Sequence, residues 1–402
     1  MGVNFMRALD KWLGIPCCFL LSLFVFCLRP FSRRQASPIK KILFLQISEM
    51  GSSVSAYSSI LKAKELFPGV EISYFIFQEM QESIHLMGVV DSDHVFTVTS
   101  KSFLGFAKGI WKMIWLMRSH KFDAILDLEL FSRLSSILSY LFGASRRVGY
   151  NNFHMEGLYR GSLQTHKVIY NHTKHISYNF LALVYALEED PAMIPLPKRF
   201  IPETDIKPLK IRSSSADRKI MLMKLRNENL RITPKTKLIL LNPNASDLLP
   251  LRRWPTENFI ETAIRLLKDK NVCILIIGVQ SEYERAEKIR ESINSDRCIN
   301  FAGKTTLRQL IDLYNISNVL LSNDSGPPNF ASLTDLRTLV FFGPETPICY
   351  KPLGKNIEVL YANYHCSPCV SAYNHRQSAC KDNQCLQALT VDLVYRQIIV
   401  KN

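Results

Sequence analysis

Asp324 and Ser325 lie one residue after the apolar run 319–322, with Asn323 between, and directly precede Gly326 and Pro327. A short polar side chain after a strand, followed by glycine and proline, is typical of a helix start with free backbone N–H groups. Such a turn binds an anion, because the N–H groups and the helix dipole both favour negative charge. A plain helix cap explains the same residues, so the neighbouring motifs have to decide between the two interpretations.

Further polar segments of the second half follow apolar runs in the same way. Residues 242–244 (NPN) and 252–255 (RRWP) come after one run, and Gly278 and Glu282 come after the next, residues 272–277. The carboxyl ends of parallel strands meet at one edge of a sheet, where ligands of α/β proteins bind. We therefore expect each of these segments to lie where a ligand binds.

The first half contains a similar series of segments. Residues 41–45 form an apolar run that leads into a small-residue turn, residues 48–53 (SEMGSS), at the opening of a helix. Residues 127–133 (DLELFSR) end a later run, and residues 143–150 (GASRRVGY) carry two adjacent arginines. Each segment alone is a weak signal, so their order along the chain carries the interpretation.

Short apolar runs alternate with longer helical segments along most of the chain, which predicts an α/β protein with parallel sheets. The expected strands are residues 41–45, 71–77, 124–128, 238–241, 272–277, 319–321 and 338–342. A polar stretch with several prolines, from Glu188 to about Pro234, interrupts the alternation and marks a domain boundary. We therefore expect a first domain at 37–205, a linker at 206–236 and a second domain at 237–402, with a ligand between the domains.

The N-terminus has the pattern of a membrane segment. Residues 13–28 contain no charged side chain, and the cations that follow are Arg29, Arg33, Arg34, Lys40 and Lys41. This run is shorter than the roughly 20 residues that span a bilayer, so we expect residues 1–36 to be a short anchor or an interfacial helix with a basic linker. The cations predict domains on the cytoplasmic face of the cytoplasmic membrane. A buried core helix is the alternative.

The formal net charge of +15 favours anionic partners such as acidic lipid, nucleic acid or a phosphorylated sugar. Nucleic acid is the poorest of these, because the basic residues do not cluster with aromatic residues on an identifiable binding module. We therefore expect no nucleic-acid partner.

Four cysteines crowd the C-terminal region, with His365 and His375 close to them in sequence. They are Cys366, Cys369, Cys380 and Cys385. This spacing is compatible with a structural zinc site or with local disulfides, although free thiols explain it equally well. The remaining cysteines show no secreted disulfide framework, which agrees with a reducing compartment.

The ordered set of motifs resembles the heptosyltransferases, which transfer heptose from ADP-heptose to lipopolysaccharide, over nearly all of the chain from residue 40. The matching segments are Met50-Gly51 and residues 146–149, 252–255, 278–282, 323–327, 342–347 and 366–369. The resemblance implies the GT-B architecture, in which two Rossmann-like domains face a cleft. It places the acceptor on the N-terminal domain and the nucleotide sugar on the C-terminal domain.

The resemblance also implies roles for individual residues. The donor diphosphate would lie at the turn of Asp324, Ser325, Gly326 and Pro327. Arg252 stands where the family usually has a lysine that neutralises these phosphates, and Glu282 matches the acidic residue that contacts the nucleoside. The candidates for binding anionic groups of the acceptor are Arg133, Arg146 and Arg147, although a solvated basic face explains the arginine pair as well.

One departure from the family concerns catalysis. The Met-Gly turn is normally followed by an aspartate, the proposed general base, and this chain has Ser52 there. A neutral hydroxyl cannot remove a proton unaided, and the nearest carboxylate is that of Glu49 in the same turn. We therefore predict Glu49 as the base. A surface glutamate favoured by the helix dipole is the alternative.

Together the residues and the resemblance predict an inverting, metal-independent glycosyltransferase that needs no cofactor. It would move a heptose-like sugar from a nucleotide-diphosphate donor to an anionic lipid-linked saccharide such as the lipopolysaccharide core. ADP-heptose is the first candidate for the donor. No Asp-x-Asp pair stands at a predicted strand end, which agrees with metal independence. The alternatives are a non-catalytic membrane protein that binds nucleotide sugars, and another GT-B enzyme such as a sugar-nucleotide epimerase.

Overall fold

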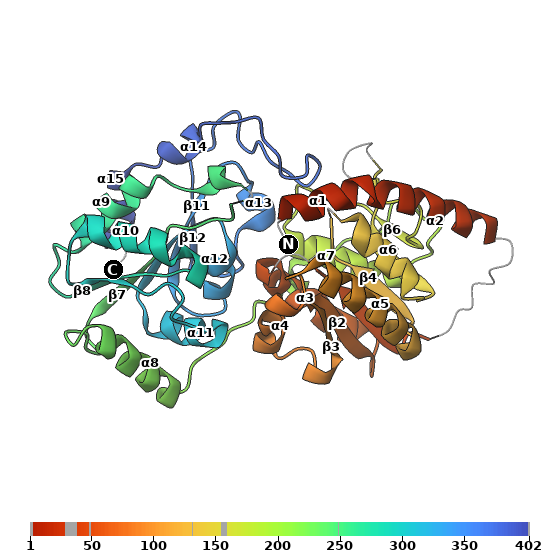
Figure 1. Ribbon diagram of the computed structural model, residues 1–402, viewed down its shortest axis with the longest axis horizontal. Helices are drawn as coiled ribbons and strands as arrows, with labels where there is room; N and C mark the ends of the chain where they lie inside the picture. The colour runs from red at the N-terminus through yellow and green to blue at the C-terminus, as the bar shows by residue number, and fades with distance from the viewer. Residues whose placement is uncertain are drawn as a thin grey trace. The chain divides into compact units, whose positions relative to one another are not determined.

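The computed structural model describes residues 3–28, 38–47, 50–130, 132–153, 159–247 and 249–400. The chain divides into two compact units, each built on a parallel sheet (Figure 1). Unit 1 comprises Met1–Lys207 and Ala372–Arg376, and unit 2 comprises Pro208–Ser371 and Gln377–Asn402.

Unit 1 contains six parallel strands in the order β3-β2-β1-β4-β5-β6. The strands are β1 (Lys41–Leu45), β2 (Glu71–Phe77), β3 (Val95–Val98), β4 (Ala124–Asp127), β5 (Arg146–Tyr150) and β6 (His166–Val168). The central strands β1, β2 and β4 are buried along nearly their whole length, because helices cover both faces of a parallel sheet. Their sequences are therefore continuous apolar runs.

The helices of unit 1 include a long N-terminal pair that precedes the first strand. They are α1 (Val3–Trp12), α2 (Gly14–Leu28), α3 (Met50–Leu66), α4 (Glu82–Met87), α5 (Phe103–His120), α6 (Arg133–Leu141) and α7 (Ile176–Tyr185). α5 and α6 close a hydrophobic core against the sheet that includes Phe75, Met117, Leu138 and Phe142. α3 packs against α7.

Unit 2 repeats this architecture with the strand order β12-β11-β10-β7-β8-β9. Its strands are β7 (Lys237–Asn242), β8 (Val272–Ile276), β9 (Cys298–Asn300), β10 (Val319–Asn323), β11 (Arg337–Phe342) and β12 (Ile357–Tyr361). Its helices are α8 (Ser215–Glu228), α9 (Thr256–Leu266), α10 (Tyr283–Ile293), α11 (Leu307–Ile316), α12 (Gly326–Ala331), α13 (Pro347–Tyr350), α14 (Gln384–Gln387) and α15 (Val391–Val400). The core joins α9, α10 and α15 to the central strands.

All seven predicted strands are present, with ends within two residues of the prediction, and the α/β class is confirmed. The strands that the sequence did not reveal are β3, β5, β6, β9 and β12, which have three to five residues each. Such short strands have too few alternating or apolar positions to stand out from loops.

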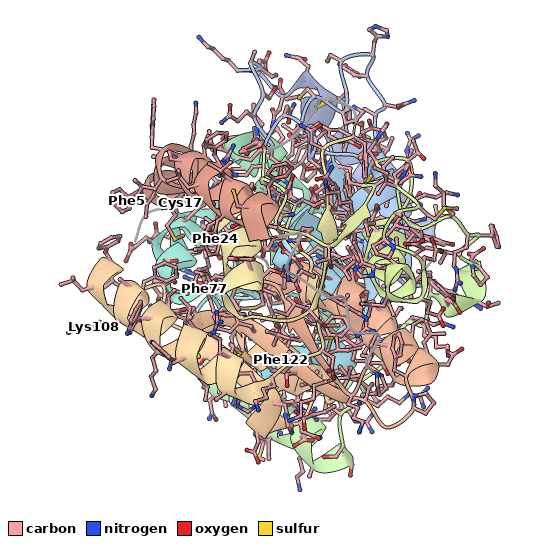
Figure 2. All side chains as sticks on the ribbon, turned by 90° about the vertical axis from the view of Figure 1, so that its right-hand side faces the viewer. Phe5, Cys17, Phe24, Phe77, Lys108 and Phe122 are labelled. Carbon is pink, nitrogen blue, oxygen red and sulfur yellow. The ribbon has the colours of Figure 1, made fainter. Side chains whose placement is uncertain are left out.

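The helical stretch Phe5–Cys27 is the one part of the described chain that is long and apolar enough to cross a membrane. It includes most of the predicted anchor, residues 13–28. Most of its side chains are exposed on unit 1, as Figure 2 shows for Phe5 and Phe24.

Candidate functional site

The candidate donor site of unit 2 begins with asparagines at the carboxyl ends of β7 and β10. Asn242 Nδ2 donates hydrogen bonds to Ser322 Oγ at 2.8 Å and to Ser325 Oγ at 2.9 Å. Ser325 is the residue before α12, yet its side chain makes no capping hydrogen bond to the helix. The hydroxyl is therefore held by the sheet edge, and the plain helix-cap interpretation does not apply to it.

Asp324 and Arg252 form the charged pair of this site. Arg252 Nη1 lies 3.5 Å from Asp324 Oδ2, and both side chains are largely buried. The backbone N–H of Asp324 donates to Phe341 O at 3.1 Å, which fixes the turn against β11. The contact places a guanidinium, the group best suited to bidentate phosphate binding, beside the turn predicted to hold an anion.

The backbone around Arg252 is anchored by buried polar contacts. Trp254 is 1% exposed, its backbone N–H donates to Asn323 Oδ1 at 2.8 Å, and its indole N–H donates to Leu389 O at 2.8 Å. Asn383 Nδ2 donates to the carbonyls of Leu251 and Arg253. The tryptophan and the two asparagines thus fix the segment from which Arg252 projects. The predictions from the sequence assigned no role to Asn323 or Asn383.

The start of α12 differs from the predicted anion site in one respect. Proline has no N–H, and the second and third residues of this six-residue helix are Pro327 and Pro328. The backbone donors at the turn are therefore fewer than we expected, and Gly326 is the first helical residue that keeps one. A methyl group built on Gly326 would meet no other side chain within 4 Å, so the space beside its Cα is open.

Glu282 and Asn244 lie together near the end of β8. A methyl group on Gly278 would come within 2.7 Å of Glu282 Oε2 and 3.0 Å of Asn244 Nδ2, so both side chains crowd this glycine. Glu282 Oε2 accepts a hydrogen bond from Val279 N at 2.9 Å, and burial raises the pKa of this carboxyl. Glu282 therefore lies beside the turn where the resemblance places the nucleoside.

Asn244 is 2% exposed, and neither polar atom of its side chain has a hydrogen-bond partner in the part of the chain that the structure describes. Buried amides are normally hydrogen-bonded, because an unpaired buried polar group is unfavourable. Asn244 is therefore a further candidate to contact the donor. The sequence contained it in the NPN segment, without a signal that distinguished it from its neighbours.

Ser52 lies in the first turn of α3 and takes part in a polar chain. Gln46 Nε2 donates to Ser52 Oγ at 2.6 Å, and the Tyr74 hydroxyl donates to Gln46 Oε1. Burial, and after it the negative charge of Glu129, raise the pKa of Tyr74. Glu49, the predicted base, lies outside the described residues, so its role stays a prediction.

Glu129 is a buried carboxylate at this end of β4 that the sequence reading did not single out. Its Oε1 accepts a hydrogen bond from Ile47 N at 2.6 Å, directly after Gln46. Its backbone N–H donates to Asp127 Oδ1 at 3.1 Å. Glu129 therefore lies beside the turn from β1 into α3, where the family has its base. The signal in the sequence was a carboxylate just after a predicted strand.

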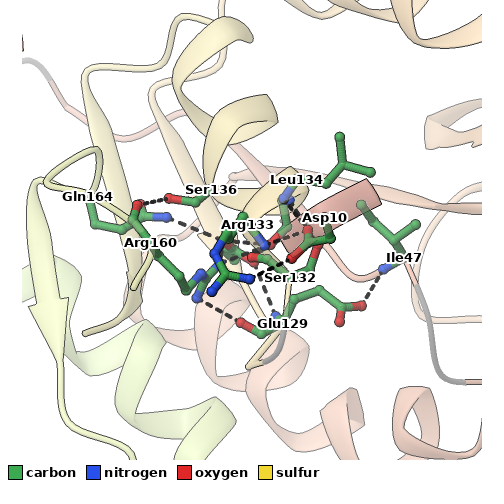
Figure 3. A network of polar contacts seen from close by, with 11 residues as sticks. Asp10, Ile47, Glu129, Ser132, Arg133, Leu134, Ser136, Arg160 and Gln164 are labelled. Atoms are coloured by element: carbon green, nitrogen blue, oxygen red, sulfur yellow. Dashed lines mark hydrogen bonds and ion pairs between the residues drawn. The ribbon is translucent and has the colours of Figure 1, made fainter. Parts of the chain in front are cut away.

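A buried ion pair supports the loop that carries Glu129 (Figure 3). Arg160 pairs with Asp127 and donates to the carbonyl of Glu129 at 2.8 Å. Asp127 also accepts from Ser135 Oγ at 3.0 Å and from Gln164 Nε2 at 3.2 Å. Burial raises the pKa of Asp127, and the Arg160 guanidinium opposes that shift. The network fixes the β4–α6 loop and with it Glu129.

The predicted acceptor residue Arg133 is buried, at 6% exposure, and engaged by the N-terminal helices. Its Nη1 lies 3.2 Å from Asp10 Oδ2, while Asp10 Oδ1 accepts from the backbone N–H groups of Arg133 and Leu134 at 2.8 and 2.9 Å (Figure 3). The guanidinium thus contacts α1 in this structure, which gives no support to the predicted acceptor contact.

Arg146 and Arg147 lie at the amino end of β5, where they pair in register with Ala124 and Ile125 of β4. Asp127, at the carboxyl end of β4, is at the opposite edge of the sheet. The Arg147 guanidinium donates to the carbonyls of Leu163 and Ala144. Ligands of parallel sheets bind at the carboxyl edge, so this position gives no support to Arg146 and Arg147 as acceptor-binding residues, and that role stays a prediction.

The four C-terminal cysteines are free thiols, so the disulfide alternative is wrong. Cys366 and Cys380 are exposed, and Cys385 is buried, with a pKa raised by burial and by the neighbouring thiols. Among the described residues, no group of three or more His, Cys, Asp or Glu side chains is placed to hold a metal ion. The structure therefore gives no support to the predicted zinc site.

The fold and site define a class of protein with two Rossmann-like units, in which a guanidinium meets the turn before α12 at the carboxyl edge of the second sheet. Residues 110–379, about two thirds of the chain, match the family model of glycosyltransferase family 9 (heptosyltransferase). The chain therefore belongs to this glycosyltransferase family.

Relatives with similar sequences are named as heptosyltransferases as well. The chain is 29% identical over 121 residues to lipopolysaccharide heptosyltransferase 2 of Salmonella typhimurium and 33% identical over 138 residues to lipooligosaccharide heptosyltransferase 2 of Haemophilus ducreyi. These stretches cover 29% and 33% of this chain, and 34% and 39% of the relatives, so the chain spans little more than a third of their length.

A solved structure confirms the GT-B fold. ADP-heptose lps heptosyltransferase II of E. coli superimposes with a TM-score of 0.68 at 18% identity, over 90% of this chain and 99% of that protein. At this identity the likeness shows the fold alone.

Proposed function

We propose that this protein transfers a heptose-like sugar from a nucleotide-diphosphate donor, with ADP-heptose as the first candidate, to an anionic lipid-linked saccharide such as the lipopolysaccharide core. Membership of the heptosyltransferase family supports the reaction class. The names of the relatives from Salmonella typhimurium and Haemophilus ducreyi support a lipopolysaccharide or lipooligosaccharide acceptor.

The observation that carries the proposal is the Arg252–Asp324 pair at the edge of the second sheet. Asp324 orients the guanidinium, which binds the diphosphate together with the N–H of Gly326. Asn244 and Glu282 contact the nucleoside end of the donor. Each contributes hydrogen-bonding atoms from a side chain that the fold has already ordered.

The proposed reaction is an inverting displacement that needs no metal. The acceptor oxygen attacks the anomeric carbon on the face opposite the diphosphate, and the bond from that carbon to the diphosphate breaks. Arg252 stabilises the negative charge that develops on the leaving group. A base removes the acceptor proton, which is worth roughly 10²–10⁴-fold in rate. Glu49 is the first candidate for this base, and Glu129 is the second because its carboxylate contacts Ile47.

The protein acts at the cytoplasmic face of the membrane in this proposal. The apolar stretch Phe5–Cys27 and the cations between residues 29 and 41 support association with a lipid surface that carries the acceptor. A membrane-bound enzyme meets a lipid-linked acceptor without extracting it from the bilayer.

The test is a transfer assay with the full chain, ADP-heptose and detergent-dispersed lipopolysaccharide core. We expect ADP release coupled to a mass gain of one heptose on the acceptor. Arg252→Ala should lower donor affinity by about 10–100-fold, since a hydrogen bond to a charged group contributes roughly 1.5–3 kcal/mol. Arg265→Ala is the matched control, because Arg265 pairs with Glu261 and Asp392 on the surface of the same unit.

Two outcomes would contradict the proposal in different ways. Binding of ADP-heptose without transfer to any saccharide would identify a non-catalytic nucleotide-sugar-binding protein, which the replacement of the family aspartate by Ser52 makes worth testing. Equal donor affinity in Arg252→Ala and the wild type would show that Arg252 does not bind the donor and that the proposed donor site is wrong.

A further inference from the structure

α5 exposes a row of large apolar and basic side chains on the surface of unit 1. Trp111 and Trp115 are 65% and 63% exposed, and Leu104, Lys108 and Lys112 are exposed with them. These positions are spaced by three or four residues, so they share one face of the helix. The opposite face packs on the core through Phe106, Ile110, Met113 and Met117. α5 is therefore apolar toward the solvent as well as toward the sheet.

Exposed apolar residues that stand alone are ordinary, whereas a contiguous patch marks an interaction surface. The two indoles contact each other edge to face, with ring centroids 6.1 Å apart, so they form one patch. Figure 2 shows Lys108 on the outer side of α5.

α2 presents a second exposed apolar face on the same unit. The exposed side chains are Phe19, Leu20, Leu23, Phe24 and Phe26. The inner face consists of small residues such as Gly14, Cys18 and Ser22, which let α2 approach unit 1 closely.

Specific contacts hold α2 along unit 1. Ser22 Oγ accepts a hydrogen bond from Ser162 N at 2.7 Å, and a methyl group on Gly161 would come within 2.4 Å of that oxygen. Gly161 has a φ of +70°, which also favours glycine. In the preceding helix α1, Asp10 accepts from the first N–H groups of α6. These contacts exist only while α1 and α2 lie against the rest of unit 1.

The two exposed faces belong to neighbouring elements. Phe5 of α1 contacts Phe103 at the start of α5, with ring centroids 6.4 Å apart. α6 contacts α1, α2 and α5. The N-terminal helices and α5 are thus parts of one surface, with α6 packed beside both.

The positive charge of this surface favours an anionic partner. Residues 94–122 contain five cations, Lys101, Lys108, Lys112, Arg118 and Lys121, and no acidic residue. Tryptophan favours the boundary between lipid and water, and lysine extends its ammonium group to the headgroups from an apolar position. An anionic bilayer satisfies both the indoles and the lysines. A second copy of this chain would bring the same positive charge against itself.

We propose that α5 and the outer face of α1–α2 form one membrane-contact surface, on which unit 1 lies flat against an anionic lipid layer. This inference rests on the membrane association proposed above and specifies its form as an in-plane contact in place of a helix that crosses the bilayer. The uncharged stretch 12–28 is about 25 Å long as a helix, which is short of the roughly 30 Å hydrocarbon core. A crossing helix would also lose the contacts of Ser22 and Asp10.

The first test measures binding of the full chain to vesicles of phosphatidylglycerol and phosphatidylethanolamine by flotation. The double variant Trp111→Ala/Trp115→Ala should bind at least about tenfold more weakly. Leu230→Ala is the matched control, because Leu230 is 83% exposed on unit 2. Equal binding of the double variant and the wild type would overturn the role of α5.

The second test separates charge from apolar contact. Lys108→Glu/Lys112→Glu should lose at least about tenfold in binding to anionic vesicles, with little change for phosphatidylcholine vesicles. Lys219→Glu/Lys235→Glu on unit 2 is the control for net charge. An equal loss in both variants would show nonspecific attraction by net charge and would overturn the proposed surface.

The third test distinguishes in-plane contact from crossing. Alkaline carbonate should release the wild type from membranes, whereas retention would show a crossing helix and overturn the in-plane arrangement. Brominated lipid should quench the fluorescence of Trp111 and Trp115 in a Trp12→Phe variant, and lack of quenching would also contradict the proposal.

All α5 variants should keep transfer to detergent-dispersed acceptor, so their failure on vesicles is distinguishable from failure of the proposed reaction. If they instead abolish self-association measured by light scattering and leave vesicle binding intact, the surface is an interface between copies.

Discussion

Replacing Asp10 by alanine should release the N-terminal helices from unit 1. The carboxylate accepts hydrogen bonds from the backbone N–H groups of Arg133 and Leu134 and pairs with the Arg133 guanidinium at 3.2 Å. Loss of a capping acceptor typically costs about 0.5–2 kcal/mol. Loss of the partner of a buried cation costs roughly 3–5 kcal/mol if the cation stays buried.

The cost of leaving Arg133 buried without its partner is an upper limit on the destabilisation by Asp10→Ala. Arg133 is covered by α1 and α2 themselves, so undocking of these helices exposes the guanidinium to water and ends the penalty. The loss in Asp10→Ala is therefore limited by the free energy with which the helices dock. We expect about 2–4 kcal/mol for Asp10→Ala. We expect about 1–2 kcal/mol for Asp10→Asn, which keeps an acceptor for the N–H groups but loses the charge.

Hydrogen exchange measured by mass spectrometry on residues 3–28 reads this free energy directly. Local opening governs the exchange rate, and 1.4 kcal/mol corresponds to about a tenfold change. Asp10→Ala should speed the exchange by about 30-fold or more and Asp10→Asn by about tenfold, with unit 2 unchanged. Asp93→Ala, an exposed aspartate of the same unit, is the control. Exchange in Asp10→Ala at the wild-type rate would refute the assigned contact.

The remaining predictions concern the site and the anchor. Asn244→Ala should weaken nucleotide-sugar binding by about tenfold with an unchanged melting temperature, measured by calorimetry, and unchanged affinity would remove Asn244 from the site. If Glu49 is the base, Glu49→Gln should lower turnover by about 10²-fold or more without loss of donor affinity, whereas an effect confined to Glu129→Gln would move that role to Glu129. Deletion of residues 1–35 should lower the fraction of the protein that sediments with membranes, as fractionation measures, because only α5 remains to contact lipid, and an unchanged fraction would contradict a membrane role for the N-terminal helices.

The sequence was sufficient for the fold because the long strands are buried on both faces. Seven continuous apolar runs predicted seven strands, and the spacing between them predicted two α/β units. β5 was harder, because its first two residues are Arg146 and Arg147, which read as a basic loop motif. The register of β5 against β4 moved the pair to the edge opposite the candidate site. A sequence does not reveal which end of an unrecognised strand a residue occupies.

The sequence predicted those parts of the candidate site that lie in recognisable motifs directly after predicted strands. Arg252 and Asp324 are 72 positions apart in the chain, and motifs at two strand ends were enough to predict that they meet. The contact of Asp10 with α6 joins residues more than 120 positions apart, with no motif on either side. The role of Asn244 rests on the missing partners of its amide, which only the packing of its neighbours reveals.

The two prolines at the start of α12 affect how the donor responds to ionic strength. Backbone N–H groups bind phosphate at short range, and salt weakens such contacts little. Pro327 and Pro328 remove two of these donors, which leaves more of the recognition to the charge of Arg252. The Arg252 guanidinium is largely buried, but it carries a full charge whose attraction for phosphate reaches further than an N–H contact, so dissolved ions weaken it more. Donor affinity in this protein should therefore fall more steeply with added salt than it would if residue 328 carried an N–H.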